Sequence, residues 1–132
     1  MNYEVLAPAG ELNAIAPLIE AGAHAIYVGL KGFSSRHSNA DLTMDEIRQA
    51  VNICHSNNAR LHIAINGGIQ NDNFNIIQNS LLTLEEYGVD AVIISDWGML
   101  YKASKLLNAT DVHASTLLGV YKAETVKLLK EM

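Results

Sequence analysis

Short apolar runs alternate with longer segments of helical periodicity along the whole chain, and this alternation constrains the fold more than any other feature. Each run of four to six residues predicts a β-strand, and the runs lie at residues 3–7, 24–28, 60–65, 90–95 and 110–113. Helices are expected at about 11–21, from 43 onwards, at 72–87, after 98 and at 117–131. Residues 29–42 are expected to form a long irregular loop. A repeated strand–helix order is typical of an α/β fold around a parallel sheet.

The clearest helix start stands at Thr43-Met44-Asp45-Glu46. A threonine at the N-cap accepts a hydrogen bond from the backbone N–H three residues on, and a glutamate at that position reaches back to the N-cap amide. The helix that follows carries apolar residues at a spacing of three and four, namely Ile47, Ala50, Val51 and Cys54. This spacing predicts one buried helical face with Cys54 in the core.

Five strand–helix units in 132 residues fit two α/β architectures. One is a flavodoxin-like open, doubly wound sheet of five strands. The other is a partial TIM-like (β/α) barrel with about five parallel strand–helix units, since a complete barrel has eight units and needs about 250 residues. Hydrophobic periodicity alone does not separate the two. In either case residues 1–132 are expected to form a single α/β domain.

The composition argues against several classes of protein. The formal net charge is −5 and the nine lysine and arginine residues form no patch, so we expect no general nucleic-acid surface. No apolar run approaches the roughly 20 residues that span a bilayer, and no segment resembles a signal peptide. We therefore expect no membrane contact and a cytoplasmic location. Cys54 is the only cysteine, which leaves no internal disulfide and no cysteine-based metal site within this chain.

Several stretches resemble the opening half of the collagenase-like peptidase family, peptidase family U32. They occur in the family's order over nearly the whole chain: VLAPAGEL at 5–12, GAHAIYVGLKGFSSR at 22–36, Asn66, GVDAVIISDWG at 88–98 and VHASTLLGVYKAETVKLL at 112–129. Two departures from the family pattern lie at the rim of the expected site. Leu117 replaces the glutamine that usually follows His-Ala-Ser-Thr, and Ser35 replaces the alanine that usually precedes Arg36.

The resemblance implies a TIM-like barrel rather than the open sheet. It also implies that these residues are the N-terminal part of a longer barrel. A barrel without its remaining strands has unpaired edges at its first and fifth strands, and open edges with exposed apolar surface promote association. We therefore expect a homo-oligomer that forms through the exposed barrel edges.

Candidate functional residues follow the predicted strands, because functional groups of parallel barrels lie at the C-terminal ends of the strands. The residues expected to bind a polar ligand are Lys31, Ser34, Arg36, Asn66, Ser115 and Thr116, and the expected catalytic residues are Asp96 and His113. Lys31 and Arg36 would bind an anionic part of the ligand. His62 alternates with Ala64 and Asn66 on one strand face and is expected to lie in the core or line the interior.

Two more specific kinds of site have weaker support. Asp96, His113 and Ser115 contain the residue types of a serine-hydrolase triad, but no Gly-x-Ser-x-Gly elbow is present. Ser115 or Thr116 serves equally well to cap the last helix. Asn66, Asp96 and His113 include metal-ligand types, but no His-Glu-x-x-His or comparable spacing accompanies them, so no metal is assigned.

Three functions stay open at this point. The resemblance implies the N-terminal barrel portion of a collagenase-like peptidase, a hydrolase that acts on a peptide or another small polar substrate, yet the residues show no recognisable protease machinery. Other members of the family are linked to hydroxylation of RNA bases or of a quinone precursor, some with an iron–sulfur cluster held by cysteines. Such a cluster needs four ligands, so Cys54 alone does not hold one and the cofactor is unknown. The third function is a non-catalytic binding module or partner subunit.

Overall fold

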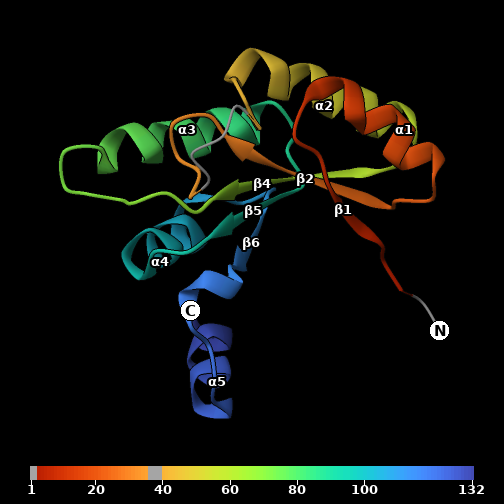
Figure 1. Cartoon of the computed structure of the whole chain (residues 1–132). Helices are drawn as coiled ribbons and strands as arrows, with labels where there is room; N and C mark the ends of the chain where they lie inside the picture. The colour runs from red at the N-terminus through yellow and green to blue at the C-terminus, as the bar shows by residue number, and fades with distance from the viewer. Residues whose placement is uncertain (1–2, 36–39) are drawn as a thin grey trace.

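The computed structural model describes residues 3–35 and 40–132, in which strands alternate with helices (Figure 1). The strands are β1 (Leu6–Pro8), β2 (Ala25–Leu30), β3 (Asp41–Leu42), β4 (Arg60–Ile65), β5 (Ala91–Ile94) and β6 (Asp111–Ala114). The α-helices are α1 (Ile15–Glu20), α2 (Met44–Ser56), α3 (Phe74–Glu86), α4 (Trp97–Leu106) and α5 (Ala123–Glu131). Two 3₁₀ turns, η1 (Leu12–Ala14) and η2 (Thr116–Leu118), precede α1 and α5.

Two elements differ from the sequence-based expectation. The segment 29–42, expected as an irregular loop, contains the short strand β3, which pairs with the end of β2. The helix expected over 117–131 begins only at Ala123, because the turn η2 ends at Gly119, whose φ of 75° lies in the left-handed region. A residue in that conformation ends a helix, and glycine adopts it without a Cβ clash.

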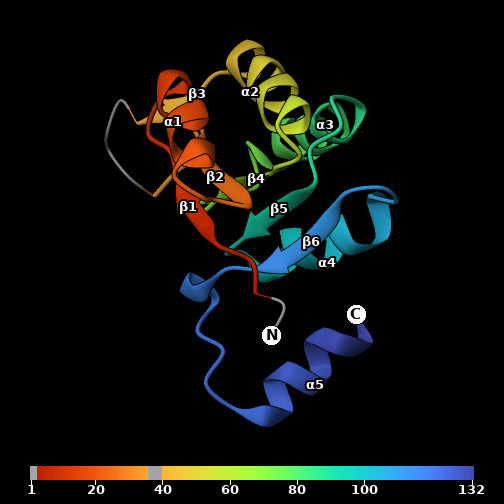
Figure 2. The ribbon, with the colours of Figure 1, turned by 90° about the vertical axis from the view of Figure 1, so that its right-hand side faces the viewer.

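The strand order distinguishes the two architectures. All pairs are parallel, and the order across the sheet is β1-β2-β4-β5-β6, with β3 beside β2. Apart from the two-residue β3, strands consecutive in the chain are neighbours in the sheet, whereas a flavodoxin-like sheet places its first strand between the second and third. Figure 2 shows the strands curving as an arc whose outer side carries α1–α4. The fold is therefore a partial TIM-like arrangement, and its strand order does not match the flavodoxin-like alternative.

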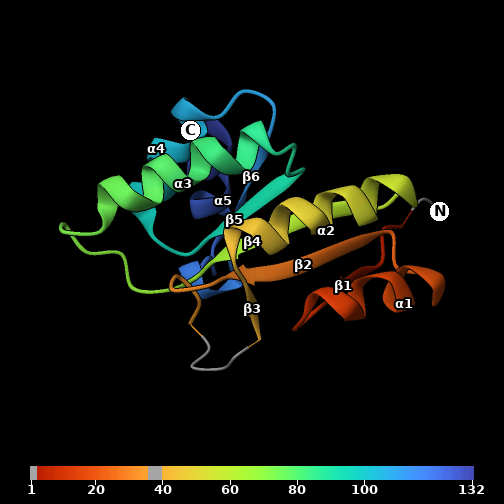
Figure 3. The same ribbon diagram turned by 90° about the horizontal axis from the view of Figure 1, so that it is seen from above.

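The core lies between the outer face of the strands and the helices that cover it (Figure 3). On β4 the outward side chains of Leu61, Ile63 and Ile65 are fully buried. The capping box is confirmed: Thr43 Oγ1 accepts a hydrogen bond from the Glu46 N–H at 3.3 Å, and the Thr43 N–H donates to Glu46 Oε2 at 2.8 Å. Cys54 lies on the buried face of α2, where burial raises the pKa of its thiol to about 11.

The two outermost strands of the described sheet, β1 and β6, each have one unpaired edge. Leu6 on β1 is 40% exposed. These edges are the physical basis of the expected self-association, which stays a prediction. Within residues 3–35 and 40–132, every helix is too short or too polar to span a bilayer.

Candidate functional site

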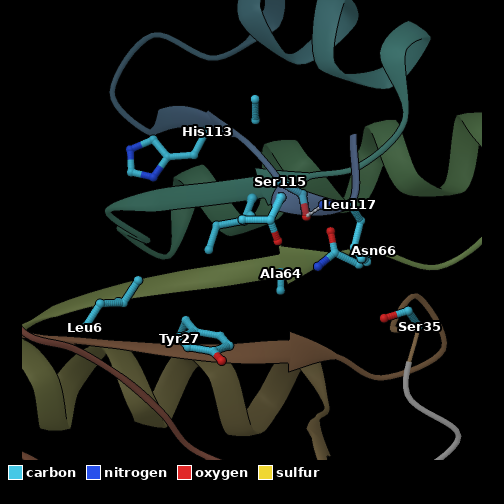
Figure 4. A pocket seen from close by; sticks show the side chains of 11 residues that line it. Leu6, Tyr27, Ser35, Ala64, Asn66, His113, Ser115 and Leu117 are labelled. Carbon is cyan, nitrogen blue, oxygen red and sulfur yellow. Dashed lines mark hydrogen bonds between the residues drawn. The ribbon is translucent and has the colours of Figure 1, made fainter. Parts of the chain in front are cut away.

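A cleft of about 560 Å³ lies on the inner face of the arc, near the C-terminal ends of its strands (Figure 4). Its floor consists of side chains that alternate with the core residues along each strand. Ala64, Ile93 and His113 occupy paired positions in the register of β4, β5 and β6. The other lining residues are Leu6, Tyr27, Ser35, Asn66, Ala114, Ser115, Thr116 and Leu117. This volume is in the range of small-molecule sites.

The cleft brings together part of the site expected from the sequence. Asn66, His113, Ser115 and Thr116 line it. Ser34 lines a smaller adjoining hollow of about 50 Å³. Lys31 lines neither space and is exposed, while Arg36 lies outside the described residues. The roles assigned to these six ligand-binding residues and to His113 stay predictions.

Asp96 does not line the cleft. Its Oδ1 accepts a hydrogen bond from the Met99 N–H at 2.7 Å, and the residue is the N-cap of α4. An aspartate in this place satisfies a backbone N–H that has no partner inside the helix. Of the three side chains expected at a common rim, Asn66 and His113 share the cleft and Asp96 stands apart. A catalytic role of Asp96 stays a prediction and would compete with its role as the cap.

Two histidine rings meet on the inner face. The rings of His62 and His113 are perpendicular, with centroids 5.3 Å apart. His62 is 1% exposed, and no hydrogen-bond partner from the described part of the chain reaches either of its ring nitrogens. Burial lowers the pKa of the His62 imidazole, and the neighbouring His113 lowers it further. His62 is therefore neutral at pH 7. Its buried ring packs against the ring of the more exposed His113.

Asn66 presents an amide to the cleft from the end of β4 (Figure 4). Its Oδ1 is buried, and no donor among residues 3–35 and 40–132 reaches it. The residue after Asn66 holds the loop that follows β2 in contact with this turn. The Gly67 N–H donates a hydrogen bond to the Phe33 carbonyl at 2.7 Å. A Cβ on Gly67 would lie 2.8 Å from the Phe33 carbonyl carbon. The loop after β2 thus packs directly on the turn after β4, which only glycine allows at this contact.

The described residues do not assemble a serine-hydrolase triad. Ser115 Oγ accepts a hydrogen bond from the Leu117 N–H at 3.2 Å and caps η2. The Asp96 carboxylate caps α4, and the ring contact of His113 is with His62. Across the described ranges, no three His, Cys, Asp or Glu side chains are grouped to hold a metal ion. The cleft instead offers hydrogen-bonding groups around a largely apolar floor.

Four lining residues were not singled out by sequence reasoning, namely Leu6, Tyr27, Ile93 and Ala114. For Tyr27 the signal was present, because it alternates with the buried Ile26 and Val28 and so points away from the core. Leu6 gave no comparable signal, and its place in the lining depends on how β1 packs against the rest of the arc. Ser35, which was expected at the rim of the site, lines the cleft.

Comparison with known proteins places the chain in a family. The model of peptidase family U32 matches residues 10–132. The chain is 31% identical to an uncharacterized protease of Methanocaldococcus jannaschii, covering 94% of this chain and 30% of that protein. It is 30% identical to the 23S rRNA 5-hydroxycytidine C2501 synthase of Escherichia coli K12, covering 99% of this chain and 19% of that protein. The chain thus spans less than a third of either relative.

A solved structure supports the fold. A ligand-free tryptophan synthase from M. tuberculosis, a TIM-barrel-like enzyme, matches with a TM-score of 0.56 at 14% identity, over 83% of this chain and 53% of that chain. At this level of identity the likeness concerns the fold alone, and it agrees with the parallel arc of strands. The match of the family model over residues 10–132 shows that the chain belongs to peptidase family U32.

Proposed function

We propose that this chain supplies the base-binding part of an RNA-hydroxylation protein. The observation that carries the proposal is the lining of the cleft. An amide with a buried oxygen lines the same cleft as the rings of Tyr27 and His113, and no lysine, arginine, aspartate or glutamate of the described chain lines this space. Unpaired RNA bases are bound by such a combination, in which the base stacks on an aromatic ring and its edge hydrogen-bonds to side chains.

The chemistry of the lining suits a base better than a phosphate. Ala64 and Ile93 form an apolar floor, and Asn66 offers both a hydrogen-bond donor and an acceptor. Phosphate binding needs lysine or arginine, and the chain as a whole carries a net charge of −5. The cleft therefore suits the base itself, with the RNA backbone outside it. The name of the Escherichia coli relative, a synthase of hydroxycytidine in 23S rRNA, supports this direction.

The proposal concerns binding and not oxygen transfer. Hydroxylation replaces a C–H bond of the base by C–OH and removes two electrons, so it requires an oxidant. We assign to this arc the orientation of the base in the cleft. These residues span less than a third of the relatives, so the activity of the whole protein is itself a proposal.

Peptide hydrolysis is the second candidate. It is favoured by the presence of His113 and Ser115 in one cleft and by the name of the Methanocaldococcus jannaschii relative. It is weakened by the hydrogen bond that engages the Ser115 hydroxyl at the start of η2.

Nucleoside analysis of RNA from the host organism tests the proposal. Deletion of the gene should remove a hydroxylated nucleoside from rRNA or tRNA, as measured by mass spectrometry, and the full-length gene should restore it. Asn66→Ala in the full-length gene should lower the restored level at least about tenfold, because a two-point contact to a base edge is lost. Asn75→Ala, at an exposed position of α3, is the matched control.

The peptidase alternative gives a different result. In that case deletion leaves the nucleosides unchanged, and the purified full-length protein cleaves casein or a collagen peptide. The cleavage should then be lost with Asp96→Ala or His113→Ala. That outcome would reject base binding as the function of the cleft.

A further inference from the structure

A carboxylate lies over strand β2 beside the cleft. Asp41 in β3 is the register partner of Gly29 in β2. The Oδ1 of Asp41 occupies the place that a Cβ on Gly29 would take, and its Cγ lies 2.8 Å from that place. Gly29 is on the same face of β2 as Tyr27, opposite the buried Val28 and Leu30. The missing side chain at position 29 thus lets the carboxylate lie on the inner face of the arc.

The Asp41 carboxylate lines the hollow of about 50 Å³ that adjoins the cleft. The hollow and the cleft share the lining residues Tyr27, Ser35, Ala64 and Asn66, so a ligand in the cleft lies next to the hollow. The hollow exceeds the roughly 10–15 Å³ that a cavity needs to hold one water molecule. It therefore admits one small substituent of a ligand whose ring lies in the cleft.

Asp41 is the charged residue of this hollow, and its other polar lining residues are Tyr27, Ser34, Ser35 and Asn66. A carboxylate accepts hydrogen bonds and donates none. A substituent with N–H groups satisfies this carboxylate, whereas an acceptor oxygen in the same place faces the carboxylate without a proton between them.

We propose that Asp41 is the specificity residue of the cleft and selects cytosine over uracil by accepting a hydrogen bond from the exocyclic N4 amino group. This inference rests on the proposed function and names the base that the cleft receives. Cytosine carries an amino donor at the position where uracil carries the acceptor O4, and carboxylates read cytosine through this donor. Gly29 provides the room that the carboxylate needs.

The experiment compares full-length wild type, Asp41→Asn and Asp45→Asn in the deletion strain. Asp45 is exposed in the first turn of α2 and undergoes the same change of charge, so it is the matched control. Hydroxycytidine and hydroxyuridine are measured in rRNA and tRNA. Wild type and Asp45→Asn should restore hydroxycytidine. Asp41→Asn should lower it at least about tenfold and raise hydroxyuridine, because the new amide donates to O4.

Calorimetry on the purified full-length proteins gives a second measurement that does not depend on turnover. Wild type should bind cytidine monophosphate at least about tenfold more tightly than uridine monophosphate. This comparison uses the wild type alone, so the inference stays testable if Asp41→Asn folds poorly.

The outcomes separate the two proposals. Equal hydroxycytidine from folded Asp41→Asn and Asp45→Asn would overturn the role of Asp41 and leave base binding intact. The same holds if wild type restores hydroxyuridine alone or binds both nucleotides equally. If wild type restores no hydroxylated nucleoside and binds neither nucleotide, the proposed function and this inference are both wrong.

Discussion

One carboxylate ties the loop before β6 to helix α3. Glu85 Oε1 accepts hydrogen bonds from the backbone N–H groups of Asn108 and Ala109, at 2.7 Å each, and of Thr110, at 3.2 Å. These bonds lower the pKa of the Glu85 carboxyl, with the Ala109 N–H as the largest cause. They fix the point where β6 begins and hence the place of His113 on that strand.

We predict that Glu85→Gln lowers the free energy of unfolding at pH 7 by about 1–1.5 kcal/mol. Hydrogen bonds to a charged acceptor contribute about 1.5–3 kcal/mol each and neutral ones about 0.5–1.5, so the charge adds about 1 kcal/mol per buried bond. Asn108 and Ala109 are exposed, so solvent screening about halves the contribution of the charge to the free energy of each of their hydrogen bonds. The bond of Thr110 is buried but longer.

Urea denaturation measures this change. Circular dichroism and the fluorescence of Trp97, the only tryptophan, report the unfolding transition. The midpoint should fall by about 0.5–1 M for a urea dependence of about 1.5–2 kcal/mol per M. Glu86→Gln is the matched control, since Glu86 is exposed, and its effect should stay within about 0.5 kcal/mol.

The pH dependence provides the sharper test. The folded pKa of Glu85 lies below its ordinary value of 4.5, so its stabilising effect is complete above that value and is lost as the pH falls through the folded pKa. The difference between wild type and Glu85→Gln should therefore narrow below about pH 4.5. A difference that stays constant down to about pH 3, or equal stabilities of Glu85→Gln and Glu86→Gln at pH 7, would refute the reasoning.

Three further predictions follow from the structure. His62→Phe should raise the melting temperature more at pH 6 than at pH 8. Burial lowers the pKa of His62, so the wild type loses stability as the pH falls below about 6.5. An equal rise in melting temperature at both pH values would contradict this. Gly67→Ala should lower the free energy of unfolding by about 1–3 kcal/mol, because its Cβ would stand 2.8 Å from the Phe33 carbonyl carbon. Gly68→Ala, where a Cβ meets no atom within 4 Å, is the matched control, and equal melting temperatures of the two variants would count against the argument. The 132-residue chain should self-associate through the edges at β1 and β6, and a monodisperse monomer in light scattering would show that the edges do not pair.

Much of the site could be predicted because one rule of parallel folds places it. The C-terminal ends of neighbouring strands lie together, so residues that follow different strands meet without any knowledge of distant contacts. Asn66 and His113 share the cleft for this reason. From the sequence, Asp96 could be either a site residue or a helix cap. The hydrogen bond from the Met99 N–H to its carboxylate shows that it caps α4.

The sequence by itself determined the local features of this protein: the succession of strands and helices, the capping box at Thr43 and the inner-face position of His62. Each depends on spacings of two to four residues, which burial imposes directly on the order of side chains. Only the tertiary structure decided the order of the strands, the strand β3 and the place of the Asp41 carboxylate over Gly29. These depend on contacts between segments far apart in the chain, whose packing no local pattern records.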